Sequence, residues 1–103
     1  MKFKKTNKFN AKKVVVDNIK FDSIKESMRY LQLKILKASG EVKDFIMQYP
    51  FKCKSGIKYI CDFRVEWKNG EVTYEDTKGV LTAVFKLKKK LVEHEFPVKI
   101  TVL

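Results

Sequence analysis

The sequence predicts one α/β domain, in which a short hairpin and a helix precede three strands in a meander, a second helix and a last strand. Three observations favour this fold class. The 103 residues are enough for one domain and too few for two. Apolar residues recur at helical spacing in two segments and alternate with polar residues in the segments between them. With 45% hydrophobic and 13% aromatic residues, the chain is too apolar to be a disordered basic tail.

The N-terminal part divides into a basic arm and a hairpin. Residues 1–13 contain six lysines and no acidic residue, which is typical of an arm that lies along a phosphate backbone. Apolar residues at 14–16 and 19–21 flank the polar pair Asp17-Asn18, and we expect these two segments to form a short hairpin. The predicted domain therefore covers residues 14–103.

The first helix is predicted between a cap at Asp22 or Ser23 and Gly40, which stands where a left-handed residue ends a helix. Tyr30 and Leu33 form a second apolar stripe beside the main one, so we expect a broad arc of the helix surface to be buried. The main apolar stripe, which we expect in the core, consists of Ile24, Met28, Leu31, Ile35 and Ala38.

Three strands are expected next, at residues 44–53, 58–67 and 71–78, with turns at Ser55-Gly56 and Asn69-Gly70. A second helix is expected over 82–93, with Thr82 as a cap. Its apolar side is expected to carry Val84, Leu87 and Leu91. A last strand is expected over 98–102.

The charge points to a polyanionic partner. The chain has 23 Lys and Arg against 12 Asp and Glu, a net charge of +11, and 21 of the basic residues are lysines. Lysine is suited to phosphates, whereas arginine is the usual reader of guanine edges, so we expect nucleic acid bound by backbone and shape. A role of the charge in solubility alone is the alternative. No apolar run approaches the roughly 18 residues of a membrane span, and we expect a soluble, cytoplasmic protein that contacts no membrane.

Carboxylates on two neighbouring strands form the most informative group. Period-two alternation places Asp76 and Lys78 on one face, with Asp62 on the adjacent strand opposite Glu75 or Asp76. Such carboxylates repel unless a cation joins them, and Mg²⁺ is the natural cation for oxygen ligands. The lysine can orient or deprotonate a water, or neutralise charge on a phosphate.

Cysteine and histidine chemistry is not expected. Cys53 and Cys61 lack the spacing of a zinc or thioredoxin-like site, and we expect no disulfide between them. His94 is the only histidine, so neither a histidine zinc site nor a serine–histidine triad is indicated.

These residues resemble the PD-(D/E)XK nuclease signature: Asp62 lies within YICDF, and Asp76-Thr77-Lys78 is followed by glycine. The predicted element order is similar to the αβββαβ core of restriction-endonuclease-like and junction-resolvase-like proteins. The segment NAKKVVVDNIKFDSIKESMRYLQLKILKASGEV resembles the start of an uncharacterised bacteriophage family assigned to that superfamily. Cys61 stands where the superfamily usually has proline.

The resemblance implies a mixed central sheet flanked by two helices, and a role for each residue of the motif. Asp62 and Asp76 would be metal ligands, Thr77 would add its backbone carbonyl, and Lys78 would be the catalytic lysine. Glu26, on the first helix, would complete the acidic cluster. The cofactor would be Mg²⁺ or Mn²⁺.

Each assignment has a structural alternative. Ser23 to Glu26 fits a capping box, in which Glu26 satisfies a helix-start amide. Asp62 would alternatively pair with Arg64 or Lys58 on the surface, and Asp76 with Lys78. Glu75 replaces Asp76 if the register is shifted. Tyr49, Phe51 and Trp67 are either stacking residues or core. The lysines expected to contact phosphate, or else to form a solvated surface, are Lys4, Lys5, Lys12, Lys13, Lys86, Lys88, Lys89 and Lys90.

The sequence therefore predicts a metal-dependent DNA endonuclease of phage origin. Its lysines favour a branched or Holliday-junction substrate over a specific sequence, and junction cutting implies a homodimer. The main alternative is a non-catalytic nucleic-acid-binding module with a nuclease-like fold. An RNA substrate, or a host enzyme as binding partner, is a third hypothesis.

Overall fold

The chain folds into two helices and a main sheet of four strands, preceded by a separate two-stranded hairpin. The computed structural model describes residues 13–77 and 81–103. The elements in chain order are β1 (Val14–Val16), β2 (Ile19–Phe21), α1 (Ile24–Ala38), β3 (Val42–Lys52), β4 (Lys58–Trp67), β5 (Val72–Asp76), α2 (Ala83–Glu95) and β6 (Ile100–Val102).

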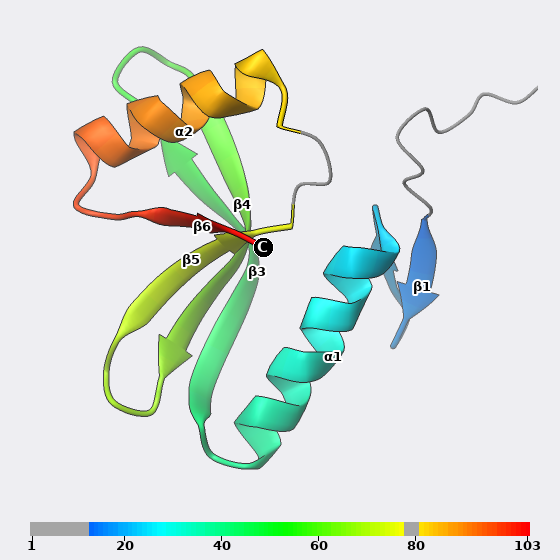
Figure 1. Ribbon diagram of the computed structural model, residues 1–103. Coiled ribbons are helices and arrows are strands. Elements are labelled where there is room, and N and C mark those ends of the chain that lie inside the picture. The colour runs from blue at the N-terminus through cyan, green and yellow to red at the C-terminus, as the bar shows by residue number, and fades with distance from the viewer. Residues whose placement is uncertain (1–12, 78–80) are drawn as a thin grey trace, which may run out of the picture.

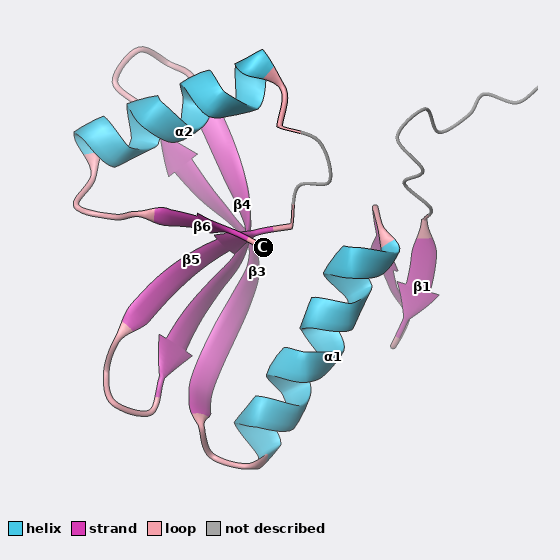
Figure 2. Cartoon of the chain, in the orientation of Figure 1, coloured by secondary structure: helices cyan, strands magenta, loops and turns pink. Residues whose placement is uncertain are grey.

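The main sheet has the order β3-β4-β5-β6. The pairs β3–β4 and β4–β5 are antiparallel, and β6 is parallel to β5. Figures 1 and 2 show α1 beside one end of the β3–β4 hairpin and α2 across its other end. The predicted mixed α/β architecture is therefore confirmed. β5 begins one residue later than predicted, β3 two residues earlier, and β6 starts at Ile100.

Local chemistry fixes the ends of α1 as predicted. The Ser23 side chain accepts a hydrogen bond from the Glu26 amide at 3.1 Å. At the other end Gly40 has φ +90°, its amide donates to Lys37, and the Glu41 amide donates to Leu36. This is a Schellman ending, which needs the left-handed conformation that glycine adopts without strain.

The buried face of α1 is not the one that the apolar stripe predicts. Ile24, Met28, Leu31 and Ile35 are 42–69% exposed, so their assignment to the core is wrong. The helix instead buries Glu26, Ser27, Tyr30 and Leu33. This face is the buried one because Tyr30 and Leu33 pack into a shared core with the hairpin residue Phe21 and with Phe63 of β4.

A similar correction applies to α2. Its Thr82 cap is as predicted, since the Thr82 hydroxyl oxygen accepts from the Phe85 amide at 3.1 Å. The buried residues are Phe85 and Val92, however, whereas Val84 and Leu87 are 62% and 58% exposed. The larger aromatic ring determines which side of this helix faces the sheet, because it buries the most apolar area.

Two cores share the β3–β4 hairpin. The α1 core contains Phe21, Tyr30, Leu33, Val42, Phe63 and Val65. The α2 core contains Phe51, Cys53, Tyr59, Cys61, Phe85, Val92 and Ile100. They lie on opposite faces of β5, because Tyr74 packs against the α2 core whereas the neighbouring Glu75 is bound by Arg29 of α1. Tyr49, Phe51 and Trp67 pack into these cores, which favours their interpretation as core residues.

The odd-numbered residues of β4 divide between the cores: Tyr59 and Cys61 face α2, whereas Phe63 and Val65 face α1. Regular alternation would keep them on one side. The change occurs at Asp62, which lies across from Gln48 because the β3–β4 register pairs Met47 with Phe63 and Tyr49 with Cys61. Gln48 has φ +56°, a left-handed conformation inside an eleven-residue strand. The side of the hairpin on which these residues are buried therefore changes at this point.

No helix within residues 13–77 and 81–103 is long and apolar enough to cross a membrane.

The burial pattern of α1 is tested by a pair of variants. Leu33→Ala should lower the free energy of unfolding by about 2–5 kcal/mol, because Leu33 is fully buried. Ile35→Ala, on the exposed side of the same helix, should change it by less than about 0.5 kcal/mol. Urea denaturation of both variants measures the difference, and equal losses would contradict the assignment.

Candidate active site

Glu26 is held in the first turn of α1 and points into the protein. The residue is only 6% exposed, and its Oε2 accepts a hydrogen bond from Gln48 Nε2 at 3.1 Å. The backbone of Asp22, just before the helix, also hydrogen-bonds the Glu26 carboxylate. Glu26 thus contributes to the start of the helix and also faces β3, so the capping alternative and a role in the site are both compatible with its position.

Asp62 lies on β4 at the change of face and is half-buried. Its Oδ2 accepts from the Thr77 amide at 2.9 Å and from the Thr77 hydroxyl at 2.8 Å. The alternative surface pair with Arg64 or Lys58 does not form among the described residues. Two donors on one oxygen orient the carboxylate against the end of β5 and leave Oδ1 outside this contact.

Asp76 is the last residue of β5 and is completely buried. The Tyr59 hydroxyl donates a short hydrogen bond to Asp76 Oδ2. The β4–β5 register pairs Phe63 with Glu75, so the next step along the strands brings Asp62 level with Asp76. The structure therefore brings together the two aspartates that strand alternation predicts.

The three carboxylates are electrostatically coupled. Burial, together with the negative charge of Asp62 and to a smaller extent that of Asp76, raises the pKa of Glu26 from 4.5 to about 7, while a hydrogen bond from the Asp22 backbone opposes the shift. Acids from α1, β4 and β5 therefore influence one another across a site where burial disfavours negative charge. A cation bound among them would relieve this repulsion.

Gln48 is a site residue that the sequence analysis missed. Its left-handed backbone and its bond to Glu26 place a side-chain amide donor beside the buried acid, opposite Asp62. Glutamine in that conformation costs of the order of 1–3 kcal/mol, which persists only where the surroundings impose it. The one sequence signal is a polar residue in an otherwise apolar segment, and such residues are common in half-exposed strands.

Glu75, the reserve ligand, has a different role. Arg29 of α1 donates to both of its carboxylate oxygens, from Nε at 2.8 Å and from Nη2 at 2.6 Å. This partly buried, bidentate pair raises the pKa of Arg29 and ties α1 to the face of β5 that points away from the α2 core. Glu75 is therefore a structural link between helix and sheet, and Asp76 is the acid that lies near Asp62.

The predicted catalytic lysine and most of the basic arm fall outside the described residues. Lys78, Lys4, Lys5 and Lys12 belong to this group. Lys13 is exposed and lies 3.6 Å from Asp22, a weak surface pair.

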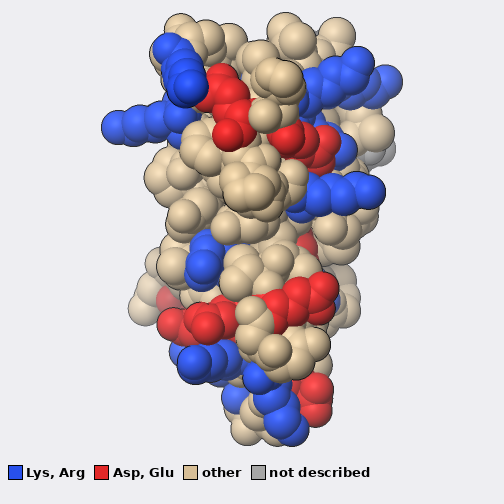
Figure 3. Space-filling view, turned by 90° about the vertical axis from the view of Figure 1, so that its left-hand side faces the viewer, with Lys and Arg blue, Asp and Glu red and all other residues tan. Residues whose placement is uncertain are grey.

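The lysines of α2 differ from one another. Lys86 and Lys90 are exposed, and Lys89 pairs with Glu93 at 3.0 Å. The exposure of Lys86 leaves its predicted contact with phosphate open, and the half-buried Lys88 lines a cleft beside β4. On the face that Figure 3 shows, basic and acidic side chains are interspersed. The described surface there is not a uniformly basic binding face.

Cysteine chemistry is not a feature of the site. Cys53 and Cys61 are both free and buried, in agreement with the predicted absence of a disulfide. The Cys61 thiol lies 3.1 Å from the Glu75 carbonyl oxygen, and burial raises its pKa to about 12. Cys61 is therefore a small core residue directly before Asp62 and not a nucleophile.

Oxygen donors dominate the site, which suits a hard cation such as Mg²⁺. Within the described residues, no three histidine, cysteine, aspartate or glutamate side chains are preassembled as a metal-binding group. The Tyr59 and Gln48 contacts hold Asp76 and Glu26 in their present positions. A cation would have to draw these carboxylates towards Asp62.

Comparison with known proteins supplies a family and no activity. Residues 6–102 match the family model described as "Protein of unknown function (DUF1064)". The chain belongs to the DUF1064 family. No curated protein and no solved structure matches it. Since the match spans nearly the whole DUF1064 chain, the hairpin, both helices and all four strands of the sheet belong to the family domain.

Stability measured against pH tests the buried Glu26 of the DUF1064 protein. Because the folded-state pKa of Glu26 is about 7 and its ordinary value is 4.5, the folded protein binds the extra proton between these pH values. The stability that the protonated Glu26 contributes is complete below pH 4.5 and is lost as pH rises through 7. The free energy of unfolding of Glu26→Gln, taken relative to that of wild type, should therefore rise by up to about 3 kcal/mol as pH increases from 4.5 to 8.

Urea denaturation at both pH values in EDTA makes this measurement. Glu71→Gln, at an exposed glutamate, is the control and should change stability by less than about 0.5 kcal/mol at either pH. A Glu26→Gln difference that does not vary with pH would contradict the assigned environment.

Proposed function

We propose that this DUF1064 protein is a metal-dependent DNA endonuclease with a restriction-endonuclease-like core. The order α1-β3-β4-β5-α2-β6, with β6 parallel to β5, supports the αβββαβ arrangement. The basic arm and the excess of lysine support a nucleic-acid substrate. Together these features suit an enzyme that hydrolyses phosphodiester bonds.

One observation carries the proposal. Glu26, Asp62 and Asp76 come from three different elements, yet the charges of the two aspartates act on the buried Glu26. Burying like charges together destabilises a fold, so such a cluster is a candidate functional site. Lys78 follows Asp76 by two residues, which is the spacing that the sequence analysis associates with phosphate chemistry.

Glu26, Asp62, Asp76 and the Thr77 carbonyl oxygen would hold Mg²⁺ or Mn²⁺. When bound, the cation would polarise the scissile phosphate, acidify water and stabilise the leaving oxygen. Thr77 orients Asp62 through two hydrogen bonds, and Gln48 orients Glu26. Lys78 would assist the attack of water or neutralise charge on the phosphate.

The substrate that fits best is branched DNA such as a four-way junction. The chain has only two arginines, Arg29 and Arg64, and Arg29 is occupied by Glu75. With few side chains suited to reading guanine, recognition would depend on phosphates and shape. Two cuts in a junction need two sites, so the active form would be a homodimer.

A non-catalytic DNA-binding module is the second candidate, and a specific observation favours it. Each acid already has a protein donor: Gln48 for Glu26, Thr77 for Asp62 and Tyr59 for Asp76. Such contacts also suit a purely structural acidic cluster. The two candidates differ in whether the acids are needed for cleavage.

Cleavage by matched variants separates the candidates. Asp62→Asn and Lys78→Ala should each lower the rate of Mg²⁺-dependent cutting of a four-way junction by at least about 100-fold, because each removes a charge that acts at the reacting phosphate. Junction binding in Ca²⁺, measured by gel shift, should be nearly unchanged.

Two control variants remove the same charges, one negative and one positive, at positions outside the proposed site. Glu66→Gln lies on the same strand as Asp62, and Lys68→Ala lies at an exposed position between β4 and β5. Both should cut at close to the wild-type rate. Equal activity of all four variants, or cutting that persists in EDTA, would exclude the proposed site, and binding without cutting by wild type would favour the module.

A further inference from the structure

The β3–β4 hairpin extends beyond the part of the sheet that it shares with β5. Within the described residues, β5 pairs with β4 as far as Phe63, so residues 49–61 form a ribbon of two strands. One side of this ribbon is covered, because Phe51, Tyr59 and Cys61 pack in the α2 core. Strand alternation turns the residues between them to the other side. The outer face of the ribbon consists of Pro50, Lys52, Lys58 and Ile60.

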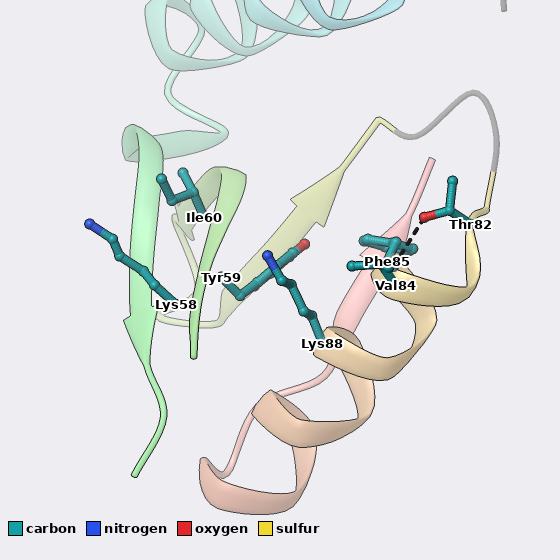
Figure 4. A pocket seen from close by; sticks show the side chains of 7 residues that line it. All are labelled: Lys58, Tyr59, Ile60, Thr82, Val84, Phe85 and Lys88. Atoms are coloured by element: carbon teal, nitrogen blue, oxygen red, sulfur yellow. Dashed lines mark hydrogen bonds between the residues drawn. The ribbon is translucent and has the colours of Figure 1, made fainter. Parts of the chain in front are cut away.

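The outer face is open to solvent and is built from two cross-strand pairs. Lys52 is paired with Lys58, and Pro50 is paired with Ile60. All four residues are exposed, including the apolar Ile60 at 45%. Figure 4 shows Lys58 and Ile60 on the side of β4 that is turned away from α2, whereas Tyr59 is directed towards that helix. The outer face therefore offers two positive charges beside a small apolar surface.

The pairing of Lys52 with Lys58 is unfavourable in the protein alone. Directly opposed residues of antiparallel strands have Cβ atoms about 5 Å apart, and like charges at these positions repel. Neither lysine forms an ion pair within residues 13–77 and 81–103. The carboxylate of Glu95 accepts a hydrogen bond from the Lys54 amide at 2.8 Å, at the turn of the ribbon. Since residues 50–61 contain three lysines and no acid, a bound anion would relieve the repulsion.

The chemistry of the outer face favours the backbone of double-stranded DNA. Lysine is a mobile point charge that suits phosphates. Single-stranded DNA is bound largely by stacking of its bases on aromatic rings. The rings of this ribbon, Phe51 and Tyr59, are buried in the α2 core, so the outer face has none to offer. A duplex, whose bases are already stacked and whose phosphates are exposed, matches a face that carries charge without rings.

We propose that the outer face of the ribbon binds the phosphate backbone of a double-stranded DNA arm, with Lys52 and Lys58 each neutralising one phosphate. The proposal rests on the proposed nuclease function and specifies where its substrate lies. Lys58 precedes Asp62 by four residues, about 13 Å along an extended strand. About four nucleotides of a duplex strand cover that distance, so one DNA strand could reach from the acidic cluster to the lysine pair.

Binding of a short fluorescent DNA duplex by the full chain in Ca²⁺, measured at several salt concentrations, tests the proposal. The double variant Lys52→Gln, Lys58→Gln should reduce the slope of log affinity against log salt concentration by about 1.8, because each phosphate contact contributes about 0.9. Its affinity at physiological salt should fall about tenfold. The matched control Lys20→Gln, Lys68→Gln removes two exposed lysines from β2 and from the β4–β5 turn, and should change the slope by less than about 0.5.

The single variant Lys52→Glu gives a readout that a purely structural role would not give. It places opposite charges at the two paired positions, so the urea midpoint of unfolding should rise. The affinity for the duplex should nevertheless fall further than in Lys52→Gln, because the new carboxylate repels the phosphate. A lower urea midpoint, or an affinity equal to that of wild type, would contradict the proposal.

An unchanged salt slope in the double variant, or equal losses in the double variant and its control, would overturn the assignment. A greater loss for single-stranded DNA than for the duplex would overturn it as well. Because the readout is binding without turnover, it is independent of the nuclease proposal. A protein that never cuts DNA but shows the selective fall in slope would keep the outer face as a DNA-binding surface and lose the nuclease function, whereas cutting with an unchanged slope would do the reverse.

Discussion

The change of face in the β3–β4 hairpin is the constraint on which the rest of the structure depends. A regular hairpin would present its buried side chains to one helix only. Here the left-handed Gln48, opposite Asp62, lets one end of the hairpin pack under α1 and the other under α2. Two small cores are built in this way from one pair of strands, and the polar residues at the change of face lie between them.

This arrangement explains why acids occur inside so small a domain. Residues at the junction of two cores are removed from water, yet they belong to neither apolar cluster. Glu26 and Asp76 are buried there with Asp62 beside them, and the raised pKa of Glu26 expresses the cost of this environment. The fold tolerates the cost because Gln48, Thr77 and Tyr59 donate hydrogen bonds to the acids.

Separate contacts keep the helices in register with the sheet. Arg29 joins α1 to Glu75, on the face of β5 away from the α2 core. Tyr59 of β4, which packs in the α2 core, donates a hydrogen bond to Asp76, the residue of β5 that follows Glu75. A displacement of either helix would therefore strain contacts at the end of β5, where the acids lie.

Much of the fold was predictable from the sequence, because turns and helix ends depend on neighbouring residues. The Asp17-Asn18 and Asn69-Gly70 turns, the Ser23 and Thr82 caps and the Gly40 ending follow local rules. The proximity of Asp62 and Asp76 also followed from strand alternation and one turn. The buried sides of the helices did not: Ile24, Met28, Leu31 and Ile35 have the right spacing and are exposed. Which stripe is buried depends on the partner surface, and the left-handed Gln48 is imposed by the two cores. Only the tertiary structure decides such features, because they are set by contacts between residues far apart in the chain.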